Sequence, residues 1–440
     1  MTRIIGLLLL VLSAPAWAAD FTVRIDQPFA EPFVGFGAQL NGWVYAFPNT
    51  GVGGTNEQTA QLLEQKIMAL RPQHVRIFVE PNGFRQNEPK VQASMLRTFR
   101  MAQNAGATIN ATHWHGPHRP PEWSAQNMVN FLVDYIDRKG LTSIRYVTLQ
   151  NEPNNSYFNK PRYEALYRAF DAGLREAGLR DRIKIIGGDL LRDGQKEWFT
   201  FLDQKLSQVL DGYSVHMYCD YNDDKHMVER VAEIPPIVAA LSPAGRKPLY
   251  VMEFGFRGKR EGKEEPGKHP NGQIISDMPL YGVLCAWRTM ESLNRGYVAI
   301  VHWDAYDAWY DRFPMQYGLL GPAKEGWRER PHYWLFKMFT HTAGPGWQSL
   351  HIDGKREKAL VSAMHSPSGD LAVYVLNRSD KPQKISVGGI AAGTTLQQRL
   401  WSAGGDGKLS SGADITSDGS ISVDLPPQSV IALTTAASGL

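Results

Sequence analysis

The chain has 440 residues, a formal net charge of +3 at pH 7, 43% hydrophobic residues and two cysteines. So small a charge gives no electrostatic reason to expect nucleic acid or a membrane surface as a partner. Two cysteines cannot form the disulfide framework of a small secreted scaffold, so stability must come from a large apolar core. Whether Cys219 and Cys285 pair or are two buried thiols stays open at this point.

The N-terminus predicts export. An apolar run from Ile4 to Leu12 follows one arginine, and the triplet Ala16-Trp17-Ala18 has the small-x-small pattern of a cleavage site. The run is too short to cross a membrane, and no later stretch approaches the ~20 apolar residues that a membrane span needs. We therefore expect residues 1–18 to be a signal peptide and the mature protein to be secreted or periplasmic, soluble and monomeric.

Between residues 33 and 346, short apolar segments alternate with helical patterns, which predicts repeated βα units around a parallel sheet. Eight strands are expected, at residues 33–40, 74–80, 107–114, 145–151, 184–190, 212–218, 249–255 and 297–303. Helices are expected between them, for example at residues 56–69, after Asn159 and at residues 274–293. Eight repeats favour a (β/α)₈ barrel. The alternative, a doubly wound sheet, is disfavoured because no glycine-rich phosphate loop follows the first strand.

Residues 347–440 have a different texture, with short alternating segments split by Gly, Ser, Asp and Pro turns, and predict a β-sandwich. Its expected strands lie at residues 359–366, 370–377, 384–389, 395–401, 421–425 and 429–435. Within the segment 19–32, the alternation from Phe21 to Ile25 makes it a candidate strand of the same sandwich. We expect Tyr374 and Trp401 to be core residues and the sandwich to brace the barrel.

Polar residues stand at the ends of the expected barrel strands, where the reacting groups of barrel enzymes lie. In strand order they are Arg76, His113, Trp114, Asn151, Glu152, His216, Tyr218, Glu253 and Trp303. Cleavage of a glycosidic bond needs one carboxylic acid and one carboxylate. Glu152 and Glu253 come from different strands and can supply this pair, because crowding two carboxyl groups raises the pKa of one of them.

Two motifs resemble the clan A glycoside hydrolases. LQNEPN at residues 149–154 is similar to their Asn-Glu-Pro signature on the fourth strand, and YVMEFGF at residues 250–256 is similar to their nucleophile segment on the seventh. The resemblance implies a retaining mechanism with Glu152 as general acid/base and Glu253 as nucleophile. It is greatest to families 30, 39 and 5, and no single family pattern is complete, so the substrate stays open.

The same resemblance implies roles for the other residues at the strand ends. It makes Arg76 a partner of the nucleophile, Asn151 a hydrogen-bonding partner of the sugar 2-hydroxyl, and Trp303 the platform under the reacting sugar. His216 and Tyr218 become polar contacts of the site. His113 and Trp114 are expected to bind substrate.

Other interpretations compete with catalysis. The Asn-Glu-Pro motif is also typical of a helix start, and Glu253 could form a structural ion pair with Arg76. A zinc site at His113, His115 and His118 is disfavoured, because nearby prolines predict a rigid loop and no HExxH helix accompanies them. We expect no metal and no cofactor. A transglycosylase and a non-catalytic carbohydrate-binding barrel remain alternatives.

The expected substrate is a β-linked polysaccharide cut internally. Aromatic residues spread over several βα loops suggest an open cleft with multiple subsites; they are Trp43, Tyr45, Trp123, Tyr157, Tyr306 and Trp309. The loop after Glu253, residues 256–269, is rich in arginine and lysine, which favours acidic sugars as one option. Neutral glucan, xylan or galactan backbones are the other.

Overall fold

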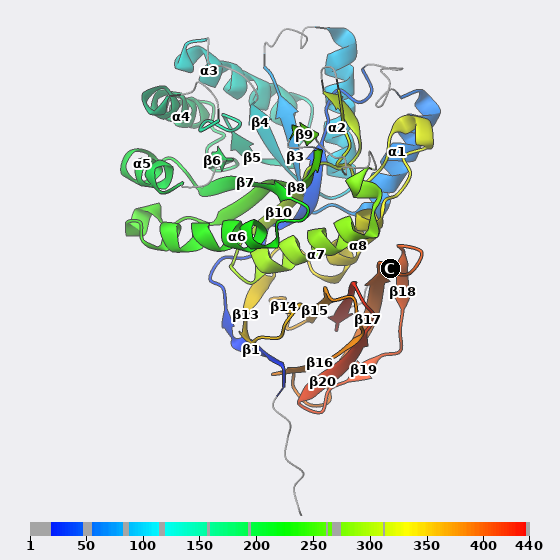
Figure 1. The fold of residues 1–440 in the computed structure, drawn as a ribbon. Coiled ribbons are helices and arrows are strands. Elements are labelled where there is room, and N and C mark those ends of the chain that lie inside the picture. Colours follow the sequence, from blue (N-terminus) through cyan, green and yellow to red (C-terminus); the bar gives the residue numbers. More distant parts are fainter. Residues whose placement is uncertain are drawn as a thin grey trace, which may run out of the picture.

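The computed structural model describes residues 19–46, 55–81, 88–113, 119–155, 159–191, 195–260, 263–265, 274–310 and 313–436. For residues 259–260, 263–265, 308–310 and 313–315 it describes the backbone alone. A barrel of strands ringed by helices sits above a curled antiparallel sheet, and helices α7 and α8 lie between the two (Figure 1).

The barrel expected from the sequence is confirmed. Its eight parallel strands are β2 (Gly35–Leu40), β3 (His74–Val79), β4 (Thr108–His113), β5 (Ile144–Thr148), β6 (Lys184–Leu190), β7 (Gly212–Asp220), β8 (Leu249–Arg260) and β10 (Ala299–His302). The barrel closes because β10 pairs in parallel with β2 on one side and β8 on the other. A doubly wound sheet would leave two open edges, so that alternative is wrong.

Each strand is followed by helical structure. The α-helices are α1 (Glu57–Leu70), α2 (Pro89–Asn104), α3 (Pro121–Leu132), α4 (Lys160–Glu176), α5 (Lys196–Leu206), α6 (Asp224–Ala239), α7 (Pro279–Leu293) and α8 (Pro331–Thr342). Shorter helical segments are η1 (Val133–Arg138, a π-helix), η2 (Pro243–Gly245), η3 (Ile275–Asp277) and η4 (Ala323–Glu325). The helix expected after Asn159 begins there because the Asn159 side chain accepts a 2.9 Å hydrogen bond from the backbone N–H of Arg162.

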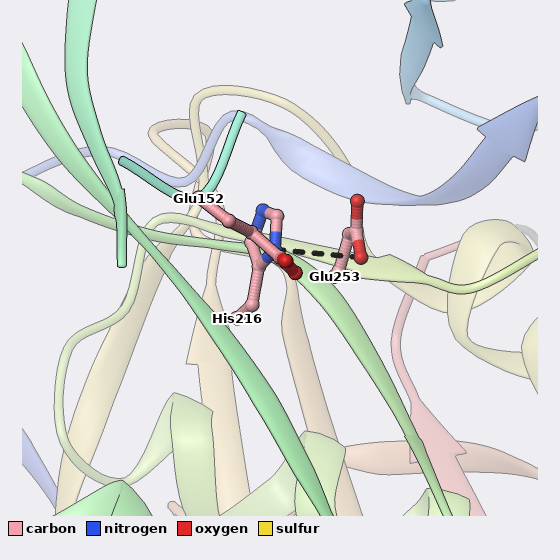
Figure 2. Close-up of side chains that lie close together, drawn as sticks. All are labelled: Glu152, His216 and Glu253. Carbon is pink, nitrogen blue, oxygen red and sulfur yellow. Dashed lines mark hydrogen bonds and ion pairs between the residues drawn. The ribbon is translucent and has the colours of Figure 1, made fainter. Parts of the chain in front are cut away.

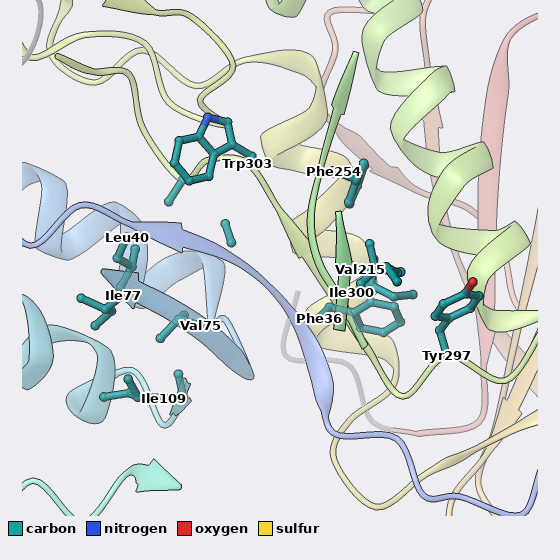
Figure 3. Packing of buried hydrophobic residues seen from close by; sticks show 14 of the residues in the cluster. Phe36, Leu40, Val75, Ile77, Ile109, Val215, Phe254, Tyr297, Ile300 and Trp303 are labelled. Atoms are coloured by element: carbon teal, nitrogen blue, oxygen red, sulfur yellow. The ribbon is translucent and has the colours of Figure 1, made fainter. Parts of the chain in front are cut away.

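The strands bury apolar side chains against these helices. Figure 3 shows part of this packing, in which Val75, Ile77 and Ile109 come from neighbouring strands and Phe254 lies near Ile300. All five side chains have no exposed surface. This apolar layer fixes the barrel on which the polar strand ends are carried.

The C-terminal part is one sheet curled on itself, as the expected sandwich requires. Its strands are β1 (Phe21–Pro28), β13 (Gln348–Gly354), β14 (Ala359–His365), β15 (Leu371–Asn377), β16 (Gln383–Gly388), β17 (Thr395–Ser402), β18 (Leu409–Ser411), β19 (Ile415–Thr416), β20 (Ser420–Leu425) and β21 (Ser429–Thr434). The N-terminal strand β1 pairs antiparallel with β13 and parallel with β16. The sequence did not predict strands β13, β18 and β19. In β13 the two buried residues are adjacent, so no alternation marks the strand, and β18 and β19 are only three and two residues long.

Strand β15 is buried on both faces. Val373 and Val375 point into the core inside the curled sheet, whereas Tyr374 and Leu376 join the core formed with the barrel helices. The Tyr374 hydroxyl lies 2.8 Å from Oγ1 of Thr342 at the end of α8. The sheet therefore packs on α7 and α8 as part of the main core.

Trp401 makes the second strong contact between the two parts. It has no exposed surface, and its Nε1–H donates to the backbone oxygens of Pro331 at 3.1 Å and Gly407 at 3.0 Å. On α7, a Cβ added at Gly282 would lie 2.7 Å from the Trp401 ring, so this close approach requires glycine. The expectation that Tyr374 and Trp401 are core residues is confirmed.

Four further features bear on the sequence expectations. Strand β8 does not end at residue 255 but continues to Arg260 and turns back into β9 (Lys263–Glu265), so the segment expected to be a loop begins as a hairpin. A second hairpin joins β11 (Ala308–Tyr310) and β12 (Phe313–Met315). Cys219 and Cys285 are both free and buried. Among the described helices, none is long and apolar enough to cross a membrane.

Candidate active site

The two predicted glutamates meet at the carboxyl ends of the barrel strands. Glu253 lies on β8, and Glu152 lies in the turn after β5. Figure 2 shows both side chains converging with His216 of β7. One oxygen of each carboxylate and one ring nitrogen of His216 all lie within 4.8 Å of one another. So close an approach of single oxygens is nearer to the ~5 to 5.5 Å separation of the carboxyl groups in retaining glycosidases than to the ~6.5 to 9.5 Å of inverting ones.

A β-bulge turns Glu253 into the site. Met252 packs in a small apolar cluster built from barrel strands, and Val251 packs in the core under the helices. Strict alternation would therefore direct Glu253 toward the helices. The pairing shifts instead, because Val215 pairs with Val251 while His216 pairs with Glu253, which leaves Met252 as the extra residue. Bulges re-aim side chains in this way near active sites.

Three donors hold the Glu253 carboxylate. Arg76 contacts Oε1, the Tyr218 hydroxyl donates to Oε2 at 2.7 Å, and Nδ1 of His216 lies 3.4 Å from Oε2. Burial raises the pKa of Glu253, while the positive charges of His216 and Arg76 act in the opposite direction and stabilise the carboxylate. Both carboxylate oxygens thus face donors that favour the ionised form.

Glu152 is the more accessible carboxyl group, with 20% of its side chain exposed. Its Oε1 lies 2.9 Å from Nδ1 of His216, and its Oε2 is 3.4 Å from Nδ2 of Asn155. The backbone of Glu152 has a φ of 46°, a left-handed conformation that residues other than glycine rarely adopt. Residues held in this region cluster at functional sites.

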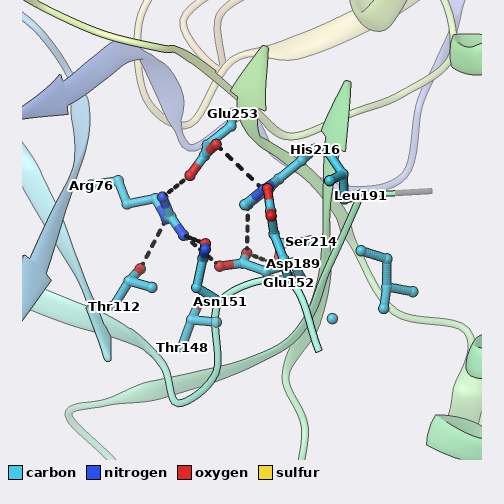
Figure 4. Close-up of polar contacts among 12 residues, drawn as sticks. Arg76, Thr112, Thr148, Asn151, Glu152, Asp189, Leu191, Ser214, His216 and Glu253 are labelled. Carbon is cyan, nitrogen blue, oxygen red and sulfur yellow. Dashed lines mark hydrogen bonds and ion pairs between the residues drawn. The ribbon is translucent and has the colours of Figure 1, made fainter. Parts of the chain in front are cut away.

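Arg76 is the hub of the buried polar network shown in Figure 4. Besides Glu253, it donates from Nε to Oγ1 of Thr112 at 3.0 Å and from its first terminal nitrogen to Oε1 of Gln39 at 3.2 Å. Its second terminal nitrogen donates to Oδ1 of Asn151 and to Oδ2 of Asp189, each at 2.7 Å. The guanidinium therefore holds residues from five other parts of the barrel in place.

Sequence reasoning missed Asp189, Thr112 and Gln39. Asp189 is fully buried on β6 and is the only acidic residue in the expected strand 184–190, so its place near a strand end was the available signal. Thr112 and Gln39 gave no comparable signal, because uncharged polar residues occur in many strands. Asn151, His216 and Tyr218 join Glu152 and Glu253 in one network, as their positions at the strand ends led us to expect.

The His216 ring lies between three carboxyl groups. Burial alone lowers its pKa, but the negative charges of Glu253 and Asp189 outweigh this effect and raise the pKa to about 9. Nδ1 of a protonated imidazole has no lone pair to offer a metal ion. Glu152, His216 and Glu253 are close enough to hold a cation, and a proton on Nδ1 of His216 would compete with a metal ion for that position.

The remaining predicted residues lie around this network. Trp303 ends the barrel after β10, is 7% exposed and packs edge-on against Phe78, with ring centroids 5.8 Å apart. The peptide bond between Trp303 and Asp304 is cis. His113 ends β4, and its Nδ1 lies 3.2 Å from the backbone oxygen of Leu149. Trp114, together with His115 and His118, lies outside the described residues.

The aromatic residues expected to form sugar subsites differ in how deeply they are buried. Tyr306 is fully buried and its hydroxyl donates to the backbone oxygen of Asn41 at 2.9 Å, so its assignment to a sugar subsite is wrong. Tyr45 lies under the guanidinium of Arg97 on α2. Trp123 is 42% exposed in the first turn of α3, on the face where β4 ends. Trp43 is half-buried, and Tyr157 and the Trp309 side chain lie outside the described structure.

The chain matches no protein-family model and no curated protein sequence. Its fold is similar to a GH30 endoxylanase from Clostridium papyrosolvens C71, with TM-score 0.70 and 15% identity over 95% of this chain and 100% of that one. An endo-β-1,6-glucanase, BT3312, has TM-score 0.64 and 17% identity over 97% and 96%. An α-L-arabinofuranosidase from Thermotoga maritima has TM-score 0.68 and 13% identity over 95% and 100%. The resemblance to family 30 is thus confirmed for the fold.

Proposed function

We propose that the protein is a retaining glycoside hydrolase. The observation that carries the proposal is the approach of Glu152 and Glu253 to within 4.8 Å across the ends of β5 and β8. This spacing leaves room for a sugar carbon between the two groups and no room for the extra water that inversion requires. The shared fold with xylanases, a glucanase and arabinofuranosidases supports a carbohydrate substrate.

The proposal gives the two glutamates different roles. Glu253 attacks the anomeric carbon with a carboxylate oxygen, and Arg76 and Tyr218 hold that carboxylate in place. Glu152, the more exposed group, transfers its proton to the glycosidic oxygen as the bond between this oxygen and the anomeric carbon breaks. In the second step Glu152 takes a proton from water, the water oxygen bonds to the anomeric carbon, and Glu253 is released.

Product stereochemistry tests the mechanism. Proton NMR of a hydrolysis reaction should show the anomer with the configuration of the substrate before mutarotation sets in. Initial release of the opposite anomer would contradict the assignment of Glu253 as nucleophile. Excess acceptor sugar in the same experiment detects transglycosylation, because the glycosyl-enzyme would then give longer products instead of free sugar.

We further propose that the substrate is a β-linked polysaccharide cut internally. In this proposal Trp303, at the end of β10, stacks on the reacting sugar, and the exposed Trp123 at the start of α3 binds a sugar farther along the chain. A panel of neutral and uronate-containing β-glycans should give oligosaccharides early in the reaction. Release of monosaccharide alone would contradict internal cleavage, and a strong salt dependence of the rate would favour acidic chains.

We also propose that the protein is exported and acts as a monomer. The support is the sequence of residues 1–18, with its apolar run and small-x-small triplet. Mass spectrometry of the protein from the culture medium or periplasm should find Ala19 as its first residue, and an intact Met1 there would contradict cleavage. Light scattering should give a mass slightly below 49.2 kDa.

A further inference from the structure

Asp189 occupies an unusual backbone position on β6. Its φ is 52°, and the pairing of β6 with β7 skips it, since Gly188 pairs with Ser214 and Leu190 with Val215. The preceding Gly188 is required, because a Cβ there would lie 2.5 Å from the backbone oxygen of Ser214. This second bulge directs the Asp189 side chain into the polar network around Arg76. Regular pairing of β6 with β7 would not require the bulge.

The Asp189 carboxylate bridges the two buried cations of the site. Oδ2 accepts from Arg76 at 2.7 Å, and Oδ1 lies 3.5 Å from Nε2 of His216, an ion-pair distance longer than an ordinary hydrogen bond. Ser214 makes two hydrogen bonds with Asp189. Its hydroxyl donates to Oδ1, and the same hydroxyl oxygen accepts a 2.8 Å hydrogen bond from the backbone N–H of Asp189. Arg76 is the largest reason that the pKa of Asp189 lies below its usual value despite burial.

His216 contacts Glu152 after β5, Asp189 on β6 and Glu253 on β8, and its backbone oxygen accepts a 3.2 Å hydrogen bond from Arg230 on α6. Tyr218 on β7 and Arg76 on β3 contact Glu253, and Arg76 also contacts Asp189. Two carboxylates, Asp189 and Glu253, balance the two cations Arg76 and His216. Of these partners, Asp189 alone contacts the ring nitrogen that points away from the two reacting glutamates.

We propose that Asp189 is a positioning residue that keeps both ring nitrogens of His216 protonated, so that the imidazolium can pair with whichever reacting glutamate is negative. The role rests on the proposed function. Before attack the negative charge is on Glu253, 3.4 Å from Nδ1. After Glu253 becomes an ester and Glu152 has given up its proton, the charge is on Glu152, 2.9 Å from the same atom. One N–H therefore serves both states without moving the ring.

Nitrogen-15 NMR of the histidine rings tests the proposal on the full chain without substrate. Because the chain has 12 histidines, the spectrum of His216→Gln identifies the His216 signals. In the unaltered protein both ring nitrogens should carry protons at pH 7.5, and the ring should titrate near pH 9. A neutral His216 ring at pH 7.5 overturns the proposal, whether or not the Asp189→Asn variant described next folds.

Asp189→Asn supplies the second measurement. The amide keeps the shape and an acceptor for Arg76 but removes the charge, so the pKa of His216 should fall by about 2 units or more. The high-pH limb of the kcat profile should move down by the same amount with KM little changed, because Asp189 does not touch substrate. A pKa for His216 within about half a unit of the original would overturn the role of Asp189.

Two controls separate this role from structural damage. Ser214→Ala removes a hydrogen bond to Asp189 but leaves its charge, so the His216 titration should stay nearly unchanged. Asp307→Asn removes a different buried carboxylate, bonded to Arg330 at 2.7 Å, and should lower stability without moving the His216 signals. If the chain cleaves no glycan at all, the proposed function fails while the NMR result still decides the protonation of His216.

Discussion

The strand ends of the barrel and the contact between α8 and the curled sheet bury groups of opposite kinds. At the strand ends, Arg76, Asp189 and His216 are charged groups with no exposed surface, and Glu152 and Asp189 adopt left-handed backbone conformations. At the contact with the sheet, Tyr374 and Trp401 are buried among apolar side chains. One region concentrates desolvated charge, and the other removes apolar surface from water.

Stability and activity therefore depend on different regions of this fold. Buried charges are weak contributors to stability, because desolvation offsets most of their attraction, and strained conformations cost about 1–3 kcal/mol each. Apolar burial contributes roughly 25 cal/mol per Å². Changes at the strand ends should therefore reduce activity in folded protein, whereas changes at the sheet should unfold protein that is active while folded.

The largest effect on activity is expected for Glu253→Gln. An amide cannot form the covalent intermediate, so kcat should fall by at least ~10³-fold on every substrate. Rates on a polysaccharide and on an aryl glycoside, together with circular dichroism, measure it. Glu164→Gln, which alters a surface pair with Arg168 on α4, is the matched control and should leave rate and fold unchanged.

Glu152→Ala should separate substrates by their leaving groups. Polysaccharides need protonation of the departing oxygen and should lose about 10²- to 10⁴-fold in rate, whereas activated aryl glycosides should lose far less in the first step. Added azide should restore rate by replacing water as the second nucleophile. Equal losses on both kinds of substrate, with no azide effect, would remove Glu152 from the acid role.

Removal of the curled sheet should have the largest effect on stability. A chain that ends at residue 346 exposes the faces of α7 and α8 that pack on β14, β15 and β21, and it also leaves β1 without its partner β13. We expect insoluble or unfolded protein, measured by solubility and circular dichroism after expression. A soluble truncation with full activity would instead make the sheet an independent module.

Trp401→Ala is a milder form of the same change. Loss of this buried ring should lower the free energy of unfolding by about 3–5 kcal/mol, while kcat per folded molecule stays unchanged below the melting transition. Denaturant unfolding monitored by fluorescence measures the loss. Trp123→Ala removes an exposed tryptophan and should change stability by less than about 0.5 kcal/mol.

The smallest effect is a two-sided pH dependence of stability. The pKa of His216 is raised from 6.5 to about 9, so its contribution is complete below pH 6.5 and is lost as the pH rises through 9. Burial lowers the pKa of His74 and His302 to about 3, so their contribution is present above pH 6.5 and is lost as the pH falls toward 3. Unfolding measured from pH 4 to 10 should show a maximum near neutrality.

Much of the fold was predictable because it depends on local patterns. The spacing of apolar segments predicted all eight barrel strands, and the Asn159 cap and Pro161 predicted the start of α4. The expected β-sandwich also formed, although β13, β18 and β19 were missed, the first because its buried residues show no regular period and the other two because they are very short. The subsite role given to Tyr306 failed for a related reason, since a tyrosine in a loop gives no local sign of whether it is buried.

The positions of Glu152 and Glu253 at the ends of the fourth and seventh barrel strands could be predicted from the sequence, because the strands and the two motifs are continuous stretches of the chain. That the side chains of Glu253 and Asp189 both point toward Arg76 and His216 depends on how the strands pair in the folded barrel. Alternation predicts one direction for each side chain, and the bulges at Met252 and Asp189 change it. A bulge arises from the pairing of two strands, so no single stretch of residues contains it.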